Sequence, residues 1–260
     1  MLKKSVFFYA VVFSIITFSL ILVFNPELYD WLSLEDHLIE NLTALALLAT
    51  SITFFLTARK SINLKLAFKV LFVFLGLVFL WGAGEEISWG QRIFGFDTPE
   101  GLKAINDQDE LNIHNINKKF FDRMVDRLTI LLVFASVLLK FFRVHNVFTI
   151  PLPSYFLLLA FGLTPFYHQY NHLIFDFYHT LYLPFLLILI VSLKDRKYNL
   201  MTATFITLVL TLVIRMLHLA YGDHFPVHNN SANEFREFLF AACCFAYAFQ
   251  IHKHYKKSIS

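Results

Sequence analysis

Eight apolar segments, most of them close to 20 residues long, constrain this chain more than any other feature. A helix of about 20 apolar residues is long enough to cross the hydrocarbon core of a bilayer. The segments predict an all-α, polytopic bundle of about eight transmembrane helices, occupying residues 1–260 as a single integral membrane domain. They are Ser5–Phe24, Leu38–Thr57, Leu66–Gly84, Leu128–Phe142, Val147–Phe166, Leu173–Leu193, Leu200–Tyr221 and Asn233–Ile251.

The composition excludes the other broad classes of protein. Hydrophobic residues make up 57% of the chain and charged residues 16%, whereas a soluble domain carries about 25% charged residues. Two adjacent cysteines, Cys243 and Cys244, indicate no disulfide framework. A net charge of +3 is too small to predict nucleic-acid binding.

The first segment is too long for a signal peptide and no cleavage site follows it, so we expect a retained anchor.

Basic and acidic residues fall on opposite sides of the predicted bundle. With eight spans, one side receives both termini, 14 of the 22 basic residues and a single acid, Asp195. The opposite side receives the other 18 of the 19 acids and eight of the 11 histidines. Because cytoplasmic loops are rich in Lys and Arg, we expect cytoplasmic termini and an acidic, histidine-rich extracytoplasmic face.

The stretch from Trp81 to Arg92 is the first of four polar stretches on that outer face. If the third helix continued through it, one face would present Glu85, Ser88, Trp89 and Arg92, with Glu86 beside them. Two adjacent carboxylates at the edge of a bilayer suit a general acid or base, and Arg92 suits an anionic group. The alternative is an interfacial belt in which tryptophans anchor the helix and the acids face water.

The second polar stretch is the longest loop, which we predict to span Ile93–Asp126. Thr98, Pro99 and Glu100 are typical of a helix start. In an extended segment, alternate residues point the same way, and amides, a carboxylate and an imidazole on one face suit a sugar or lipid headgroup. The candidate substrate-binding residues are Asn106, Gln108, Glu110, Asn112 and His114. A solvated loop with polar side chains is the alternative.

The third polar stretch contains three histidines and an aspartate between residues 165 and 179. A helix starting at Thr164 and Pro165 would place His168, His172, Asp176 and His179 on one stripe. These ligand types predict a metal site, most plausibly zinc. One straight helix cannot bring all four to one ion, so we expect two neighbours to share the ion with ligands such as His218. One alternative is a turn at 169–171, which would leave only Asp176 and His179 in the span. The other is a histidine-rich interfacial loop that binds no metal.

The fourth polar stretch joins the last two segments. Arg215 lies about 10 Å inside its segment, so its guanidinium needs an acidic partner or an anionic ligand. Glu85, Glu234 and Glu237 are the candidate partners. The start of the last segment also contributes Glu234, Arg236 and Glu237 as candidate substrate-binding residues. The alternative role for these charges is a structural ion pair between helices.

Two resemblances bear on the interpretation. The block Gly84–Arg92, followed by Asn106-x-Gln-x-Glu-x-Asn112 and His114-Asn115, resembles a block in bacterial polytopic membrane proteins of no assigned activity. It covers residues 81–115 and implies a multi-pass protein of a bacterial cytoplasmic membrane. The spacing His168-x-x-x-His172 is similar to a motif of the alkaline ceramidases and progestin/adipoQ receptors, seven-helix membrane hydrolases with zinc held by three histidines. There the motif lies on the last helix, so no residue roles are carried over.

These stretches together favour an integral membrane enzyme that acts on a lipid or lipid-linked headgroup. In a metal-dependent hydrolase, zinc would activate water, Glu85 or Glu86 would be the general base, and Arg215 or Arg92 would bind phosphate. A headgroup transferase would need no metal. The alternatives are a transporter, which the near-absence of ionisable residues in the cytoplasmic halves of the spans argues against, and a non-enzymatic sensor or assembly partner.

Overall fold

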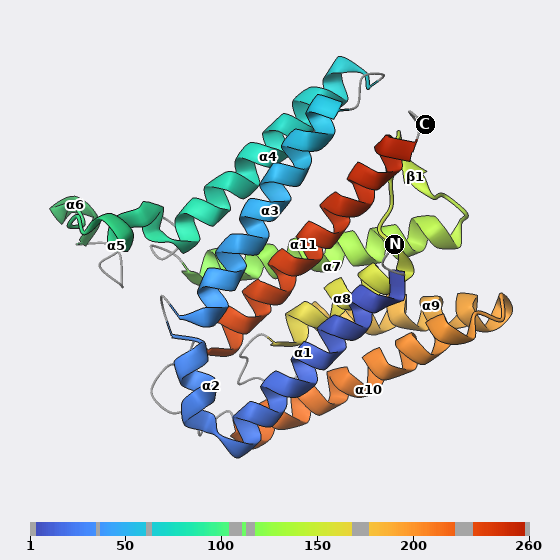
Figure 1. Cartoon of the computed structure of the whole chain (residues 1–260). Coiled ribbons are helices and arrows are strands. Elements are labelled where there is room, and N and C mark those ends of the chain that lie inside the picture. Colours follow the sequence, from blue (N-terminus) through green and yellow to red (C-terminus); the bar gives the residue numbers. More distant parts are fainter. Residues whose placement is uncertain are drawn as a thin grey trace.

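The computed structural model describes residues 4–34, 37–60, 64–103, 111–112, 118–167, 177–221 and 231–257. It confirms the predicted helical fold, with one short hairpin added (Figure 1). The α-helices are α1 (Lys4–Phe24), α2 (Pro26–Leu32), α3 (Leu38–Lys60), α4 (Leu66–Glu86), α5 (Gln91–Phe94), α6 (Glu100–Lys103), α7 (Lys118–Phe141), α8 (Tyr155–Leu163), α9 (Tyr182–Lys194), α10 (Tyr198–Tyr221) and α11 (Ser231–Lys257). The 3₁₀ helices are η1 (Ser88–Gly90), η3 (Thr164–Tyr167) and η4 (Phe177–Leu181), and the hairpin pairs β1 (Asn146–Val147) with β2 (Ile150–Pro151).

Among the described residues, four helices are long and apolar enough to cross a membrane. The qualifying stretches are Ser5–Phe24, Leu38–Arg59, Leu66–Glu86 and Tyr198–Leu217. Two shorter apolar stretches, Tyr155–Tyr167 and Tyr178–Lys194, and the longer but more charged helices α7 and α11 complete the set of predicted segments. The chain therefore has the helices of an integral membrane protein.

Helix α11 lies at the centre of the arrangement. Helix α3 packs along α11, and α4 packs along α3, so these three helices run side by side (Figure 1). Helices α1, α7, α8, α9 and α10 form the remainder of the bundle, where α8 contacts α1, α7, α10 and α11. The main apolar core surrounds α8, and its fully buried members include Phe8, Leu158, Phe161 and Phe185.

The long helices alternate in direction, so their ends gather into two groups (Figure 1). We call the end where α1 begins and α11 ends the basic end. There, α11 holds the hairpin and the start of α8 through hydrogen bonds from Ser154 N to Gln250 Oε1 (3.0 Å) and from Tyr255 Oη to the Thr149 carbonyl (3.0 Å). We call the opposite end, where α4 ends and α11 begins, the acidic end.

Three of the predicted segments differ from the structure at their boundaries. The sixth was predicted as Leu173–Leu193, and its described part consists of the 3₁₀ helix η4 followed by α9, which begins at Tyr182. The fifth was predicted to start at Val147, but residues 146–151 form the hairpin and α8 begins at Tyr155. Pro151 and Pro153 lack the N–H that a helix needs and disfavour helical conformation in the residues before them. The Ser154 hydroxyl caps α8 by accepting a hydrogen bond from Leu157 N (3.3 Å).

The fourth segment begins earlier than predicted. Helix α7 starts at Lys118, ten residues before Leu128, so the end of the predicted loop Ile93–Asp126 is helical. Its first turns are amphipathic: Asp122 and Asp126 are buried, whereas Arg123 and Arg127 are exposed. A search for continuous apolar residues misses such a helix because its buried face carries charge.

The predicted helix starts had different outcomes. A four-residue helix, α6, does begin at Glu100. No separate α-helix starts at Thr164 within the described residues, because α8 passes through Gly162 and tightens directly into the 3₁₀ helix η3 at Thr164. The Thr164 hydroxyl donates backward to the Phe161 carbonyl (3.0 Å) instead of capping a new helix.

Candidate functional site

The acidic end of α4 contains a turn with unusual backbone geometry. Helix α4 ends at Glu86, and the next residues take left-handed conformations, with φ of 45° at Ser88, 54° at Trp89 and 78° at Gly90. The shared face of Glu85, Ser88, Trp89 and Arg92 was predicted on the condition that the helix continued, and this condition is not met because α4 ends at Glu86 and the backbone kinks at Trp89. Glycine adopts positive φ freely, but each non-glycine residue there costs roughly 1–2 kcal/mol.

This turn folds Trp89 back over the end of α4. The indole Nε1 donates a hydrogen bond to Glu85 Oε1 at 2.8 Å. The ring lies over Gly84, where an added Cβ would sit 3.0 Å from the indole, and it packs edge-on against Trp81. Glu85 is only 5% exposed, and Glu86 beside it is half-buried. The left-handed turn thus places a neutral donor on a buried carboxylate.

Gln91 holds the segment that follows the turn. Its Nε2 donates to Thr98 Oγ1 (2.6 Å), and its Oε1 accepts from the backbone N–H of Leu111 (2.7 Å). The next residue, Asn112, is 2% exposed, and its Nδ2 lies 3.4 Å from Ser88 Oγ. Asn112, a predicted substrate-binding residue, is therefore brought to the same turn as Glu85.

A second polar cluster joins α7 to α11 at the acidic end. The Arg236 guanidinium is 1% exposed and donates to Asp122 Oδ1 (2.6 Å) and Asp126 Oδ2 (3.1 Å), and to Glu237 Oε1 (3.2 Å). The predicted binding residues Arg236 and Glu237 are thus engaged with each other and with two aspartates that the sequence analysis did not select. The spacing of Asp122 and Asp126, four residues apart before an apolar run, would have suggested them as a pair on one helix face.

The two clusters lie on neighbouring helices at a similar depth. Leu47 of α3, Ala83 of α4 and Ala241 of α11 form one small apolar cluster. Glu85 lies two residues beyond Ala83 toward the acidic end, and Glu237 lies four residues beyond Ala241 in the same direction. Both carboxylates are therefore within about 6 Å, along the helix axes, of the same packed layer.

Other predicted residues take separate positions. Glu234 is buried on the first turn of α11, and Arg215 is half-buried on α10. His179 stacks on Tyr178, with 4.4 Å between ring centroids. Seven predicted residues lie outside the described residues, as do the side chains of Arg92 and His218. The seven are Asn106, Gln108, Glu110, His114, His168, His172 and Asp176.

The predicted zinc site rests mainly on residues outside the described ranges. Within those ranges, no three His, Cys, Asp or Glu side chains are arranged to hold a metal ion. Only His179 of the proposed ligands has a described side chain. Zinc therefore stays a prediction.

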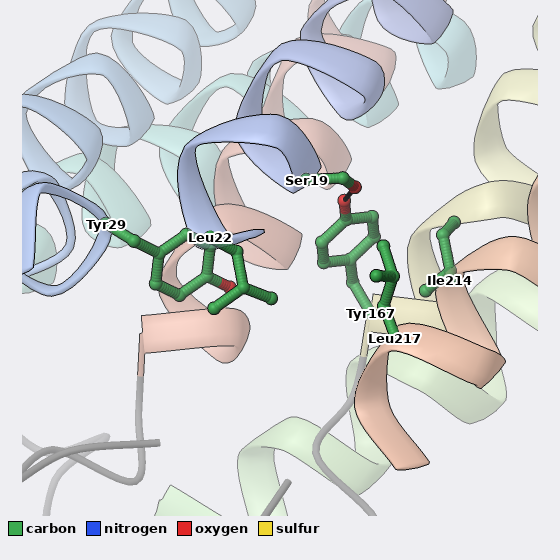
Figure 2. Close-up of a pocket in the computed structure, with 6 residues that line it drawn as sticks. All are labelled: Ser19, Leu22, Tyr29, Tyr167, Ile214 and Leu217. Carbon is green, nitrogen blue, oxygen red and sulfur yellow. Dashed lines mark hydrogen bonds between the residues drawn. The ribbon is translucent and has the colours of Figure 1, made fainter. Parts of the chain in front are cut away.

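A narrow crevice between α1, α2, η3 and α10 contains two tyrosines and a serine (Figure 2). Tyr167 Oη lies 2.7 Å from Ser19 Oγ, and Tyr29 is on the other side of the crevice. Although about 190 Å³ lies between its lining atoms, no space is left for a water molecule. The crevice is therefore a packing feature and does not supply the polar cavity that an enzyme needs.

Substituting Gly84 tests the placement of Trp89. In Gly84→Ala, the added Cβ forces the indole away from Glu85, and we expect a net loss of about 1 kcal/mol in the free energy of unfolding. Gly82→Ala is the matched control because its Cβ meets only Leu47 at an ordinary 3.5 Å. In a Trp31→Phe background, Gly84→Ala should change the tryptophan fluorescence spectrum and Gly82→Ala should not. Identical spectra would contradict the described contact.

Comparisons with known proteins add no assignment to this geometry. No protein-family model, curated protein or solved structure matches the chain. The residues themselves, led by Glu85, Trp89, Ser88 and Asn112, are the basis for a functional assignment.

Proposed function

We propose that the chain is an integral membrane enzyme acting on a lipid or lipid-linked headgroup, with Glu85 as its general base. The observation that supports this is the buried Glu85 carboxylate held by Trp89 across a left-handed turn. Strained backbone of this kind persists where the surrounding structure enforces it, and such residues cluster at active sites. A turn that served only to end α4 would need no left-handed tryptophan.

The residues around Glu85 support a transfer reaction to a hydroxyl group. Glu85 would accept the proton from an acceptor hydroxyl or water, while the Trp89 N–H fixes which carboxylate oxygen faces the reactant. Ser88 and Asn112 supply a hydroxyl and an amide at the same turn, and both groups suit the polar atoms of a headgroup. In the hydrolase version, zinc held by the histidines of residues 168–179 would activate the water.

The ionic cluster of α7 and α11 has a supporting role in this proposal. Arg236 already contacts three carboxylates, so its charge is offset and it is poorly suited to hold a substrate phosphate. We assign it to positioning α7 against α11. Arg215, half-buried on α10, is the better choice for an anionic group.

We also propose eight membrane crossings with cytoplasmic termini, in a bacterial cytoplasmic membrane. Helix α1 begins and α11 ends at the same end of the bundle, which supports an even number of crossings (Figure 1). Helices α7 and α11, of 24 and 27 residues, reach about 36 and 40 Å, enough to cross despite their charged ends. The acidic end would then face the outside.

Replacing Glu85 tests the proposed function. We would reconstitute wild type, Glu85→Gln and the exposed control Glu27→Gln into vesicles of bacterial total lipid extract containing lipid-linked glycans. Mass spectrometry should detect a lipid species that is converted by wild type and by Glu27→Gln. Glu85→Gln should retain the wild-type thermal unfolding midpoint but lose the conversion, because glutamine cannot accept the proton. Conversion by Glu85→Gln at the wild-type rate, or no conversion by wild type, would exclude the proposal.

A further inference from the structure

Two arginines at the basic end adopt a backbone conformation that normally belongs to glycine. Arg143 follows α7 with φ of 64°, and Arg196 follows α9 with φ of 52°. Each occupies the residue after the helix cap in the same type of helix ending. The N–H of Val144 donates to the Leu139 carbonyl (2.9 Å), and the N–H of Lys197 donates to the Ser192 carbonyl (2.8 Å).

Glycine is the usual residue at this position because a side chain there is strained. An arginine therefore carries a cost in stability, and the helix ending itself does not require it. Cations in the last helical turn, such as Lys140 and Lys194, already complement the helix dipole. The repeated use of arginine in two separate turns thus points to a role for its side chain.

The two turns lie at the same end of the bundle. Helices α7 and α9 pack against each other, and both end at the basic end (Figure 1). The hydrogen bond from Lys197 (2.6 Å) lowers the pKa of Asp195, and the nearby charges of Lys194 and Arg143 lower it further.

The two turns form a strongly positive cluster, which contains the cations Arg143, Lys194, Arg196 and Lys197. Asp195 is the single acid of this cluster, and Lys197 already pairs with it. Within the described ranges, neither Arg143 nor Arg196 hydrogen-bonds to a carboxylate, and both side chains are exposed. Lys140 adds a fifth cation, with its Nζ 5.1 Å above the ring of Tyr155.

Exposed aromatic residues lie near the two turns in the chain. Phe142 (69% exposed) precedes Arg143, Tyr198 (66% exposed) follows Lys197, and Phe148 (88% exposed) lies in the hairpin that follows α7. Aromatic side chains at this level of a membrane protein lie among lipid headgroups. Basic pockets between helix ends, flanked by apolar side chains, are suited to the phosphate of an anionic lipid.

We propose that the turns after α7 and α9 form a binding site for the phosphate of an anionic phospholipid, with Arg143 and Arg196 as its principal ligands. The site lies at the opposite end of the bundle from Glu85. It depends on membrane embedding but not on the enzyme proposed above.

Substituting both arginines with glycine separates charge from backbone strain. A glycine at each of these two positions would fit the left-handed conformation better than arginine does. Arg143→Gly/Arg196→Gly should therefore fold with an unfolding midpoint no lower than wild type in neutral detergent. Each cation near the membrane surface strengthens the binding of an anionic lipid by about fivefold. Losing two cations should therefore weaken anionic lipid binding about 30-fold. Arg143→Asn/Arg196→Asn is the second variant, because asparagine also tolerates this conformation.

The measurement is the thermal unfolding midpoint as dioctanoyl phosphatidylglycerol is titrated into the protein in neutral detergent. The midpoint should rise for wild type and for Arg123→Ala/Arg127→Ala, which removes two exposed arginines from the acidic end of α7. The glycine and asparagine variants should need much more lipid for the same rise. An equal response of all variants would overturn the proposal. So would an equal rise with dioctanoyl phosphatidylcholine or with inorganic phosphate at the same concentration.

Discussion

Arg236→Met is expected to lower the free energy of unfolding by about 3–5 kcal/mol, the usual cost of removing one partner from a buried ion cluster. Methionine fills much of the same volume but leaves the Asp122 and Asp126 carboxylates without the guanidinium that contacts them at 2.6 and 3.1 Å. Both aspartates are less than 9% exposed, so water cannot replace the lost contacts. Unfolding in mixed micelles of increasing sodium dodecyl sulfate, followed by circular dichroism, measures the change.

A matched control and a rescue variant make this prediction specific. Arg123→Met removes an exposed arginine next to Asp122 and should change stability by less than about 0.5 kcal/mol. Replacing the guanidinium and both aspartates together, in Arg236→Met/Asp122→Leu/Asp126→Leu, should recover most of the loss because the two most buried carboxylates are removed with the guanidinium and only the more exposed Glu237 loses a partner. An Arg236→Met variant as stable as Arg123→Met would show that the cluster is not buried as described.

Gly162→Ala is expected to destabilise the bundle by about 2–3 kcal/mol, near the upper end of the range for overpacking a core. An added Cβ at Gly162 would lie 2.5 Å from Cε1 and 2.6 Å from Cζ of Phe185. Phe185 is fully buried and packs against Phe166, so its ring cannot move out of the way. Helices α8 and α9 must therefore separate, although alanine by itself would favour the helix by about 1 kcal/mol.

A second substitution should reverse this effect. Phe185→Leu in the Gly162→Ala background shortens the side chain at the contact and should restore part of the lost stability, whereas Phe185→Leu alone should be destabilising. Gly82→Ala, in another helix but with space for its Cβ, should not be destabilising. Thermal unfolding midpoints in one detergent compare the four variants. Simple additivity of Gly162→Ala and Phe185→Leu would show that the two residues do not interact.

Hydropathy was sufficient to locate the helices because a bilayer demands long apolar runs. Five of the eight predicted segments correspond to single described helices whose starts match within two residues, and Leu66 begins α4 as predicted. The boundaries failed where a segment depended on more than apolar character. Pro151 and Pro153 diverted the chain into a hairpin, and the charged first turns of α7 were assigned to a loop.

The candidate site was harder to predict than the fold. The sequence identified Glu85 as an unusual carboxylate at a helix end. The hydrogen bond that Trp89 donates to it, however, depends on two non-glycine residues in left-handed conformations. Helical periodicity has no means of anticipating such a turn. The partners of Arg236 lie 110 and 114 residues earlier in the chain, and a single sequence contains no information that links them.

That separation has a consequence for how the protein is made. A ribosome adds about 5–20 residues per second, so Asp122 and Asp126 are synthesised roughly 5–20 s before Arg236. During this interval the aspartates have no guanidinium to offset their charge in α7. If α7 crosses the membrane as proposed, its first turns would have to stay in the headgroup region until α11 is made. Helix α11 would then complete the insertion of a helix made much earlier, and a chain halted before residue 236 would present two carboxylates without their guanidinium to the machinery that removes failed membrane proteins.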